Sequence, residues 1–205
     1  MYGAGLSIGG EDPIDRDVLE DLSKFCKRHR PDSIAERFVI STMDGPVRAG
    51  SPLARSQAIL NRVCDQIDLV QEALRHAILL ENPVIQSPPC AGAIGETDLL
   101  TLIVNRTGCG LLFDVDNALA STRAQSSDPH SYLDAFPLEA VCQIRLAFTP
   151  RNSGANVWQL YRETIRRLGP VPTLVACEGE GIDWTSLRAE VARADAVLAR
   201  EFSMA

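Results

Sequence analysis

The sequence has 205 residues, of which 45% are hydrophobic and 23% are charged, and its formal net charge is -7. These proportions are typical of a globular chain and exclude extensive disorder, and the length predicts a single domain spanning residues 1–205. The acidic charge argues against a nucleic-acid surface, which needs basic residues to displace counterions from phosphates.

The cysteines indicate a reducing compartment. None of the six belongs to a CxxC pair, and no segment has the roughly 18 consecutive apolar residues of a membrane span. Scattered cysteines in a chain of this length are most simply buried small hydrophobic residues. We therefore expect a soluble, cytoplasmic protein that contacts neither nucleic acid nor membrane.

Short apolar segments alternate with amphipathic segments along the whole chain, a pattern typical of repeated βα units and a parallel sheet. The expected strands cover residues 2–8, 33–40, 77–81, 110–115, 140–147 and 172–177. The expected helices cover residues 15–29, 56–75, 96–105, 116–124, 157–168 and 184–200, with one more short helix before residue 140. Residues 41–52 and the segment leading to Gly95 are expected to be loops.

Six βα units are fewer than the eight that close a TIM-type barrel. The fold expected is therefore an open sheet or an incomplete (β/α) barrel. Its end strands, residues 2–8 and 172–177, would have unpaired backbone groups, which predicts self-association through exposed strand edges. Because right-handed crossovers place the loops that follow the strands on one face, that face is where we expect the site.

Charged residues lie in or at the ends of several expected strands. Glu81 and Asp114 end two strands, and Asn117 lies just beyond the second. Arg37 and Arg145 lie inside two others. The carboxylates are candidate metal ligands or an acid–base pair. The alternative is a structural ion-pair network with the arginines, since an isolated buried charge is unfavourable, and spacing alone slightly favours this alternative.

Several sequence blocks together are specific for a known family. They are YGAGLSIGG (2–10), IAERFVIS (34–41), ILLENP (78–83), RTGCGLLFDVDN (106–117), DPHSYLDAFPLEAV (128–141), QIRLAF (143–148) and VWQLYRETIRRLGPVPTLV (157–175). In this order they resemble the multinuclear non-heme iron-dependent oxidative enzymes (MNIO), a family that includes the oxidase of methanobactin synthesis. The resemblance covers nearly the whole chain.

The resemblance implies a (β/α)₈ barrel that binds two or three irons at the carboxyl ends of its strands. Such enzymes use oxygen to modify residues, often cysteines, in ribosomally made precursor peptides, usually with a partner protein that presents the peptide. On this alignment the chain begins at the third strand, so the first two βα units, about a quarter of a barrel, are missing.

The same alignment implies a depleted metal site. Three family ligands survive and four positions are substituted. The survivors are Glu81, Asp114 and Asn117, and the substituted positions are Tyr2, Arg37, Arg145 and Ala176. The acid that precedes Arg37 survives as Glu36, and an Asp-x-His segment is deleted around residues 151–155.

Arginine has no free lone pair for a metal, and oxygen ligands without imidazole hold iron poorly. Guanidinium groups can instead supply the positive charge, so we expect Arg37 and Arg145 within ion-pair reach of Glu81 or Asp114. The interpretation is a divergent, metal-poor and inactive member of the family that binds a peptide or a partner protein, with no cofactor.

Two alternatives stay open. One is an active iron-dependent oxidase whose ligands are rearranged, with four acidic or phenolic side chains as replacements: Tyr2, Glu36, Glu178 and Glu180. The other is a truncated gene product without a function of its own. The sequence names no substrate peptide and no oligomeric state.

Overall fold

The computed structural model describes residues 1–2, 5–38, 41–42, 45–46, 56–85, 93–148, 154–177 and 183–202. Helices and strands alternate along these residues. The strands are β1 (Ala35–Arg37), β2 (Ser41–Thr42), β3 (Gly45–Pro46), β4 (Leu79–Glu81), β5 (Gly110–Asp114), β6 (Val141–Phe148) and β7 (Thr173–Cys177). The helices are α1 (Arg16–His29), α2 (Gln57–Leu74), α3 (Glu96–Thr107), α4 (Val115–Ala124), α5 (Pro129–Ala135), the 3₁₀ turn Leu138–Ala140, α6 (Ala155–Leu168) and α7 (Trp184–Phe202). Of the described helices, none is both long and apolar enough to span a membrane.

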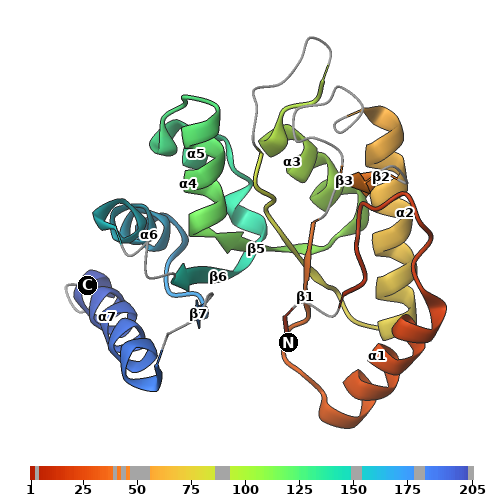
Figure 1. Cartoon of the computed structure of the whole chain (residues 1–205), viewed down its shortest axis with the longest axis horizontal. Coiled ribbons are helices and arrows are strands. Elements are labelled where there is room, and N and C mark those ends of the chain that lie inside the picture. The colour runs from red at the N-terminus through yellow and green to blue at the C-terminus, as the bar shows by residue number, and fades with distance from the viewer. Residues whose placement is uncertain are drawn as a thin grey trace.

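The main sheet has five parallel strands in the order β1-β4-β5-β6-β7, so neighbouring strands follow one another in the chain. In Figure 1, helices α1 to α3 lie around the β1 half of the curved sheet and helices α4 to α7 around the β7 half. Within the described residues the sheet does not close, because β1 and β7 are its two ends. The fold is an incomplete TIM-type barrel, as the βα pattern predicts.

The first expected strand, residues 2–8, is wrong beyond its start. Of the residues in this range that the structure describes (2 and 5–8), only Tyr2 forms a parallel bridge, with Ala35. The backbone then leaves the extended conformation, since Gly5, Ser7 and Gly9 all have positive φ angles of 83°, 51° and 97°. Such angles are incompatible with a strand. The apolar content of this segment reflects burial of Leu6 and Ile8 in the core rather than strand pairing.

Two further expectations change in detail. The predicted loop after β1 contains the short antiparallel hairpin β2–β3. The predicted strand 33–40 pairs over Ala35–Arg37 alone, and residues 39–40 lie outside the described residues.

The strands separate two apolar layers, because successive side chains point to opposite faces of a sheet. Side chains such as Leu80, Leu111 and Phe113 are fully buried in the large core under the helices. The opposite, concave face has its own small cluster, formed by Ala35, Leu79 and Leu112 against Tyr2. The concave face thus has an apolar floor, above which the strands end in charged residues.

Candidate functional site

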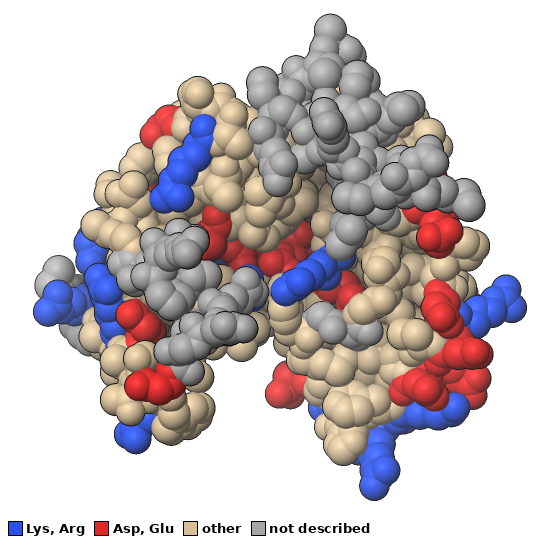
Figure 2. Space-filling view, viewed as in Figure 1, with Lys and Arg blue, Asp and Glu red and all other residues tan. Residues whose placement is uncertain are grey.

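The strand register brings the charged residues at the strand ends together. Arg37 on β1 lies opposite Glu81 on β4, and Asp114 on β5 lies opposite Arg145 on β6. All four are on the concave side at or near the carboxyl ends of their strands, where parallel βα folds place their sites. Figure 2 shows acidic and basic side chains meeting in the hollow at the centre of this face.

Arg145 is the central cation of the cluster. Its side chain is only 4% exposed, its Nη1 forms an ion pair with Asp114 Oδ2, and the same nitrogen lies 3.7 Å from Glu81 Oε1. Burial by itself would lower the pKa of this guanidinium, but the carboxylate of Asp114 outweighs that effect and raises it. The charge on Arg145 is therefore permanent and is placed between two carboxylates.

Asp114 and Asn117 are held by the start of α4. Asp114 is the N-cap of this helix, and its Oδ1 accepts a hydrogen bond of 2.8 Å from the Asn117 backbone N–H. The side chain of Asn117 donates to Glu81 Oε1 at 3.1 Å and to the Asn82 carbonyl at 2.9 Å. The helix terminus thus fixes the positions of two predicted ligands at once.

Glu81 has a raised pKa. Burial raises its pKa to about 7, although the hydrogen bond from the Tyr2 hydroxyl, 2.6 Å from Oε2, opposes the rise; the negative charge of Asp114 adds to it. Arg145 is closer to Asp114 than to Glu81. Glu81 is therefore a carboxyl group that exchanges its proton near neutral pH.

Tyr2 connects the second arginine to the cluster. Burial raises the pKa of Tyr2 to about 12, and the hydrogen bond to Glu81 adds to the effect, so the phenol stays protonated. Arg37 Nε donates to the Tyr2 hydroxyl at 2.9 Å. The guanidinium carbons of Arg37 and Arg145 lie 5.5 Å and 4.9 Å from the centre of the tyrosine ring. These are cation–π distances.

Comparison with models of protein families shows to which family the chain belongs. The family model described as "RiPP precursor modification enzyme MbnB/TglH/ChrH" matches residues 1–199. The chain belongs to this family. It is the MNIO family that the sequence blocks resemble.

Curated relatives agree with this assignment. The UPF0276 protein of Caulobacter vibrioides is 36% identical over 214 residues, which cover 97% of this chain and 76% of that protein. The UPF0276 protein of Bordetella pertussis is 37% identical over 222 residues, covering 100% of this chain and 77% of that protein.

Solved structures share the fold at low sequence identity. D-psicose 3-epimerase from Clostridium cellulolyticum superposes with a TM-score of 0.62 at 11% identity, covering 96% of this chain and 76% of its own. A sugar phosphate isomerase/epimerase from Parabacteroides distasonis gives 0.58 at 10% identity, covering 90% of this chain and 64% of its own. These matches concern the barrel architecture alone.

The residues present do not fit the iron that MNIO membership implies. Among the described residues, no three His, Cys, Asp or Glu side chains are grouped to hold a metal ion. The oxygens of Glu81 and Asp114 already accept bonds from Tyr2, Asn117 and Arg145. A permanent guanidinium charge in this position repels a metal cation.

The other predicted site residues are placed as follows. Ala176 lies on β7 opposite Ala147 and has no donor atom. Glu36 is buried, and the alternation of β1 puts it on the face opposite Arg37, where its Oε2 accepts the Leu6 N–H at 3.3 Å. Glu178 and Glu180 lie outside the described residues.

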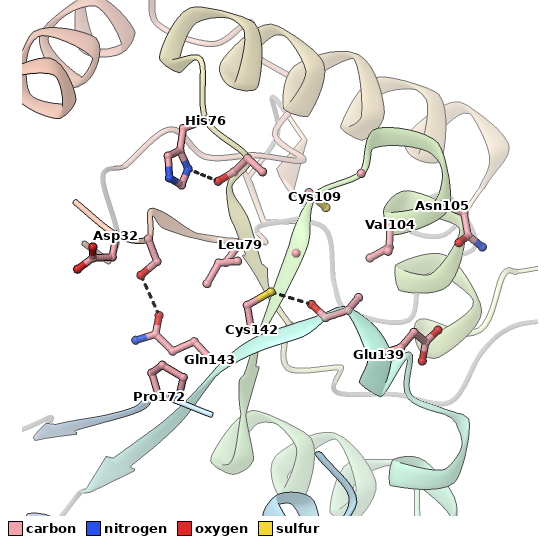
Figure 3. Close-up of a pocket in the computed structure, with 15 residues that line it drawn as sticks. Asp32, His76, Leu79, Val104, Asn105, Cys109, Glu139, Cys142, Gln143 and Pro172 are labelled. Carbon is pink, nitrogen blue, oxygen red and sulfur yellow. Dashed lines mark hydrogen bonds between the residues drawn. The ribbon is translucent and has the colours of Figure 1, made fainter. Parts of the chain in front are cut away.

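A cavity of about 250 Å³ opens at this end of the strands. Its charged and amide lining comes from Arg37, Glu81, Asn82, Asn117 and Arg145, and its apolar lining from Phe38, Pro83 and Val84. A larger cavity, about 810 Å³, lies at the amino ends of the strands, lined by Leu79, Cys109 and Cys142 among others (Figure 3). Because TIM-type folds carry their chemistry at the carboxyl ends, we assign the site to the smaller cavity.

Two supporting residues were missed from the sequence. Asn82 is fully buried and pairs reciprocally with the Asp114 backbone, accepting its N–H at 2.6 Å and donating to its carbonyl at 3.1 Å. Asp116 accepts the Ala147 N–H at 3.0 Å, and burial raises its pKa to about 6. The available signal for Asn82 was its place directly after Glu81, at a strand end before a proline.

Proposed function

We propose that this chain, a member of the MNIO family, binds a peptide or a partner protein and does not carry out iron-dependent oxidation. The binding surface is the smaller cavity at the carboxyl ends of the strands, here called the mouth of the half-barrel. The observation behind the proposal is the buried guanidinium of Arg145, in contact with Asp114 and 3.7 Å from Glu81. It supplies beside these carboxylates the positive charge that a metal supplies in an active site.

The electrostatics support this interpretation. Two carboxylates close together in a desolvated site repel each other, so one takes up a proton unless a cation stands between them. Arg145 neutralises Asp114, while Glu81 keeps a pKa of about 7. The charges of the cluster are therefore balanced without a metal. The barrel fold around the cluster then serves as a binding surface.

The lining of the mouth suits a peptide. Exposed Arg37 and the amide of Asn117 provide polar contacts, and Phe38, Pro83 and Val84 provide apolar contact beside them. The lining is more polar than apolar, and its fixed polar groups can orient a ligand that also contacts the smaller apolar side.

Iron content tests the loss of metal. Protein incubated anaerobically with ferrous iron and desalted should retain substoichiometric iron by mass spectrometry. The matched variant Arg145→His replaces the cation with an imidazole and should retain more. Stoichiometric iron in the unaltered chain, lost on Glu81→Gln, would replace this proposal with the active oxidase whose ligands are rearranged.

Peptide selection tests the binding role. A phage-displayed peptide library is panned on the purified chain, and enriched peptides are measured by calorimetry. We expect Arg37→Glu to weaken their binding, whereas Arg16→Glu, an exposed reversal on α1, should not. Enriched peptides that bind both variants equally, or no enriched peptides, would exclude the mouth as the binding surface.

A further inference from the structure

A further cavity, of about 490 Å³, lies in the outer layer of helices. Its wall comes from α6, from Arg193 on α7 and from His130 on α5, and it shares no residue with the mouth. Helices α6 and α7 lie next to each other in Figure 1 and are in contact. The wall contains no residue of the sheet, so this cavity is independent of what lies beyond β1 and β7. It is called the α6–α7 cavity below.

The wall of the α6–α7 cavity is mainly cationic. Its charged residues are three arginines and one acid: Arg162, Glu163, Arg166 and Arg193. The Glu163 carboxylate already accepts a hydrogen bond of 3.0 Å from Arg167 Nε. The chain as a whole has a net charge of -7, so a positive wall of this kind is a local feature. Such a wall attracts anions and repels metal cations.

The carboxylates that pair with these arginines are more buried than the arginines. Arg162 Nε and Arg166 Nε lie 3.5 Å and 2.6 Å from the two oxygens of Glu201, whose side chain is 15% exposed, against 44% and 56% for the two arginines. Among the described residues, the terminal Nη nitrogens of both guanidinium groups have no hydrogen-bond partner. Arg193 Nη1 is 4.0 Å from Glu190, beyond hydrogen-bond distance. Guanidinium groups in this state can bind carboxylate or phosphate oxygens two at a time.

The same wall contains a hydrogen-bond donor without an acceptor. Trp158 is 3% exposed, and ring contacts with Phe148 at 5.6 Å and Tyr161 at 5.9 Å fix its position. Its indole Nε1 is buried, and no described residue accepts its hydrogen. A buried donor in this state is unfavourable unless an oxygen is supplied to it. The guanidinium carbon of Arg193 lies 4.2 Å from the ring centre, so an exposed and movable side chain covers the indole.

We propose that the α6–α7 cavity binds a small molecule through an oxyanion, which is a phosphate or a carboxylate group. The Nη nitrogens of Arg162 and Arg166 hold the oxyanion from α6, and Arg193 turns from the indole ring to hold it from α7. The uncovered Trp158 N–H donates to one of its oxygens. The cavity is larger than the anion alone, so the ligand carries a further group. The inference is independent of what binds at the mouth.

Calorimetric titration of the full chain tests the site. Sodium phosphate and sodium citrate are compared with sodium chloride at equal ionic strength. We expect saturable binding of phosphate, of citrate or of both at one site per chain, and no binding of chloride. Binding of phosphate alone would identify the ligand class as phosphate esters, and binding of citrate alone would identify it as carboxylic acids. Binding of neither, or an equal response to chloride, overturns the proposal.

Variants test where the anion binds. Arg166→Ala and Arg193→Ala should each weaken its binding about tenfold or more, whereas Arg188→Ala, at an exposed position of α7 outside the cavity wall, should not. Arg166→Ala also removes a bond between α6 and α7, so Glu201→Gln is the second test. It removes the carboxylate that competes for Arg162 and Arg166, and it should tighten binding. Equal affinities in all these proteins would overturn the proposal.

Fluorescence tests the role of the indole. The chain has two tryptophans, so in the variant Trp184→Phe the emission comes from Trp158 alone. Phosphate or citrate, whichever binds, should change this emission, and chloride should not. Trp158→Phe keeps an aromatic ring without the N–H, and it should weaken binding about threefold or more while circular dichroism shows an unchanged fold. Emission that stays constant at saturation would overturn the placement of the anion at this wall.

Discussion

At the scale of single residues, the site is defined by an unequal sharing of one cation. Arg145 forms an ion pair with Asp114 and lies farther from Glu81, so the two carboxylates have different roles. Arg37, which the sequence placed with the carboxylates, donates to the Tyr2 hydroxyl, and this hydroxyl donates to Glu81.

Removing Arg145 should destabilise the fold. Arg145→Ala leaves the buried carboxylate of Asp114 without its ion-pair partner, for which we expect a loss of about 3–5 kcal/mol in the free energy of unfolding by urea denaturation. Lys24→Ala removes exposed ion pairs with Glu20 and Asp21, and it should change the free energy of unfolding little. Equal, small losses for both would mean that the Arg145 pair is not desolvated.

The stability of the chain should fall as pH rises towards neutrality. The folded pKa of Glu81, about 7, exceeds its ordinary value of 4.5, so the folded state binds the proton more tightly than the unfolded state. This stabilisation is complete below about pH 4.5 and is lost as pH rises through 7, by at most about 3 kcal/mol. Asp116, with its pKa raised from 3.8 to about 6, acts in the same direction.

Glu81→Gln removes one of these titrations while keeping an oxygen for the Tyr2 hydroxyl. Between pH 5 and pH 8, the free energy of unfolding measured by urea denaturation should therefore fall less for this variant than for the unaltered chain. Glu20→Gln, at an exposed position, should show the same dependence of the free energy of unfolding on pH as the unaltered chain. Parallel curves for all three proteins would assign the pH dependence to other groups.

At the scale of elements, β5 depends on a close approach at its first residue. A Cβ at Gly110 would lie 2.6 Å from Leu79 Cδ2 and 3.1 Å from Cys142 Sγ. Gly110→Ala should therefore lower the free energy of unfolding by about 1–3 kcal/mol through overpacking. Gly154→Ser, at the α6 N-cap where a Cβ meets nothing within 4 Å, should cause no loss in thermal denaturation. Tolerance of the alanine at Gly110 would show that the side chains of Leu79 and Cys142 can move aside.

The elements also show where local patterns suffice. Helix α2 matches its predicted range closely, because Ile59, Val63, Ile67 and Val70 form a regular stripe that ends up buried. Residues 5–8 were assigned to a strand because apolar content alone does not distinguish a strand from a buried irregular segment. Backbone N–H groups in and just after this segment donate to side chains: Leu6 N–H to Glu36 Oε2 and Gly9 N–H to Gln66 Oε1.

At the scale of the whole molecule, the proposed replacement of the metal by guanidinium predicts that iron does not stabilise the chain. Only a ligand that binds the folded state raises the melting temperature. Added ferrous iron should thus leave the melting temperature unchanged under anaerobic conditions, whereas the variant Arg37→His/Arg145→His should show a rise that a chelator reverses. A rise in the unaltered chain would indicate a metal site among the residues present.

The sequence by itself determined the alternation of βα units, the parallel order of the strands and the presence of Glu81 and Asp114 at strand ends. These features depend on hydrophobic periodicity and on connection rules, which are local in the chain. The tertiary structure decided that Arg145 forms its ion pair with Asp114 and that Asn82 accepts a hydrogen bond from the Asp114 backbone. It also decided that the Tyr2 hydroxyl links Arg37 to Glu81 by hydrogen bonds. Those contacts join residues about 30 to 80 positions apart, and they depend on strand register and side-chain direction, neither of which a single sequence specifies.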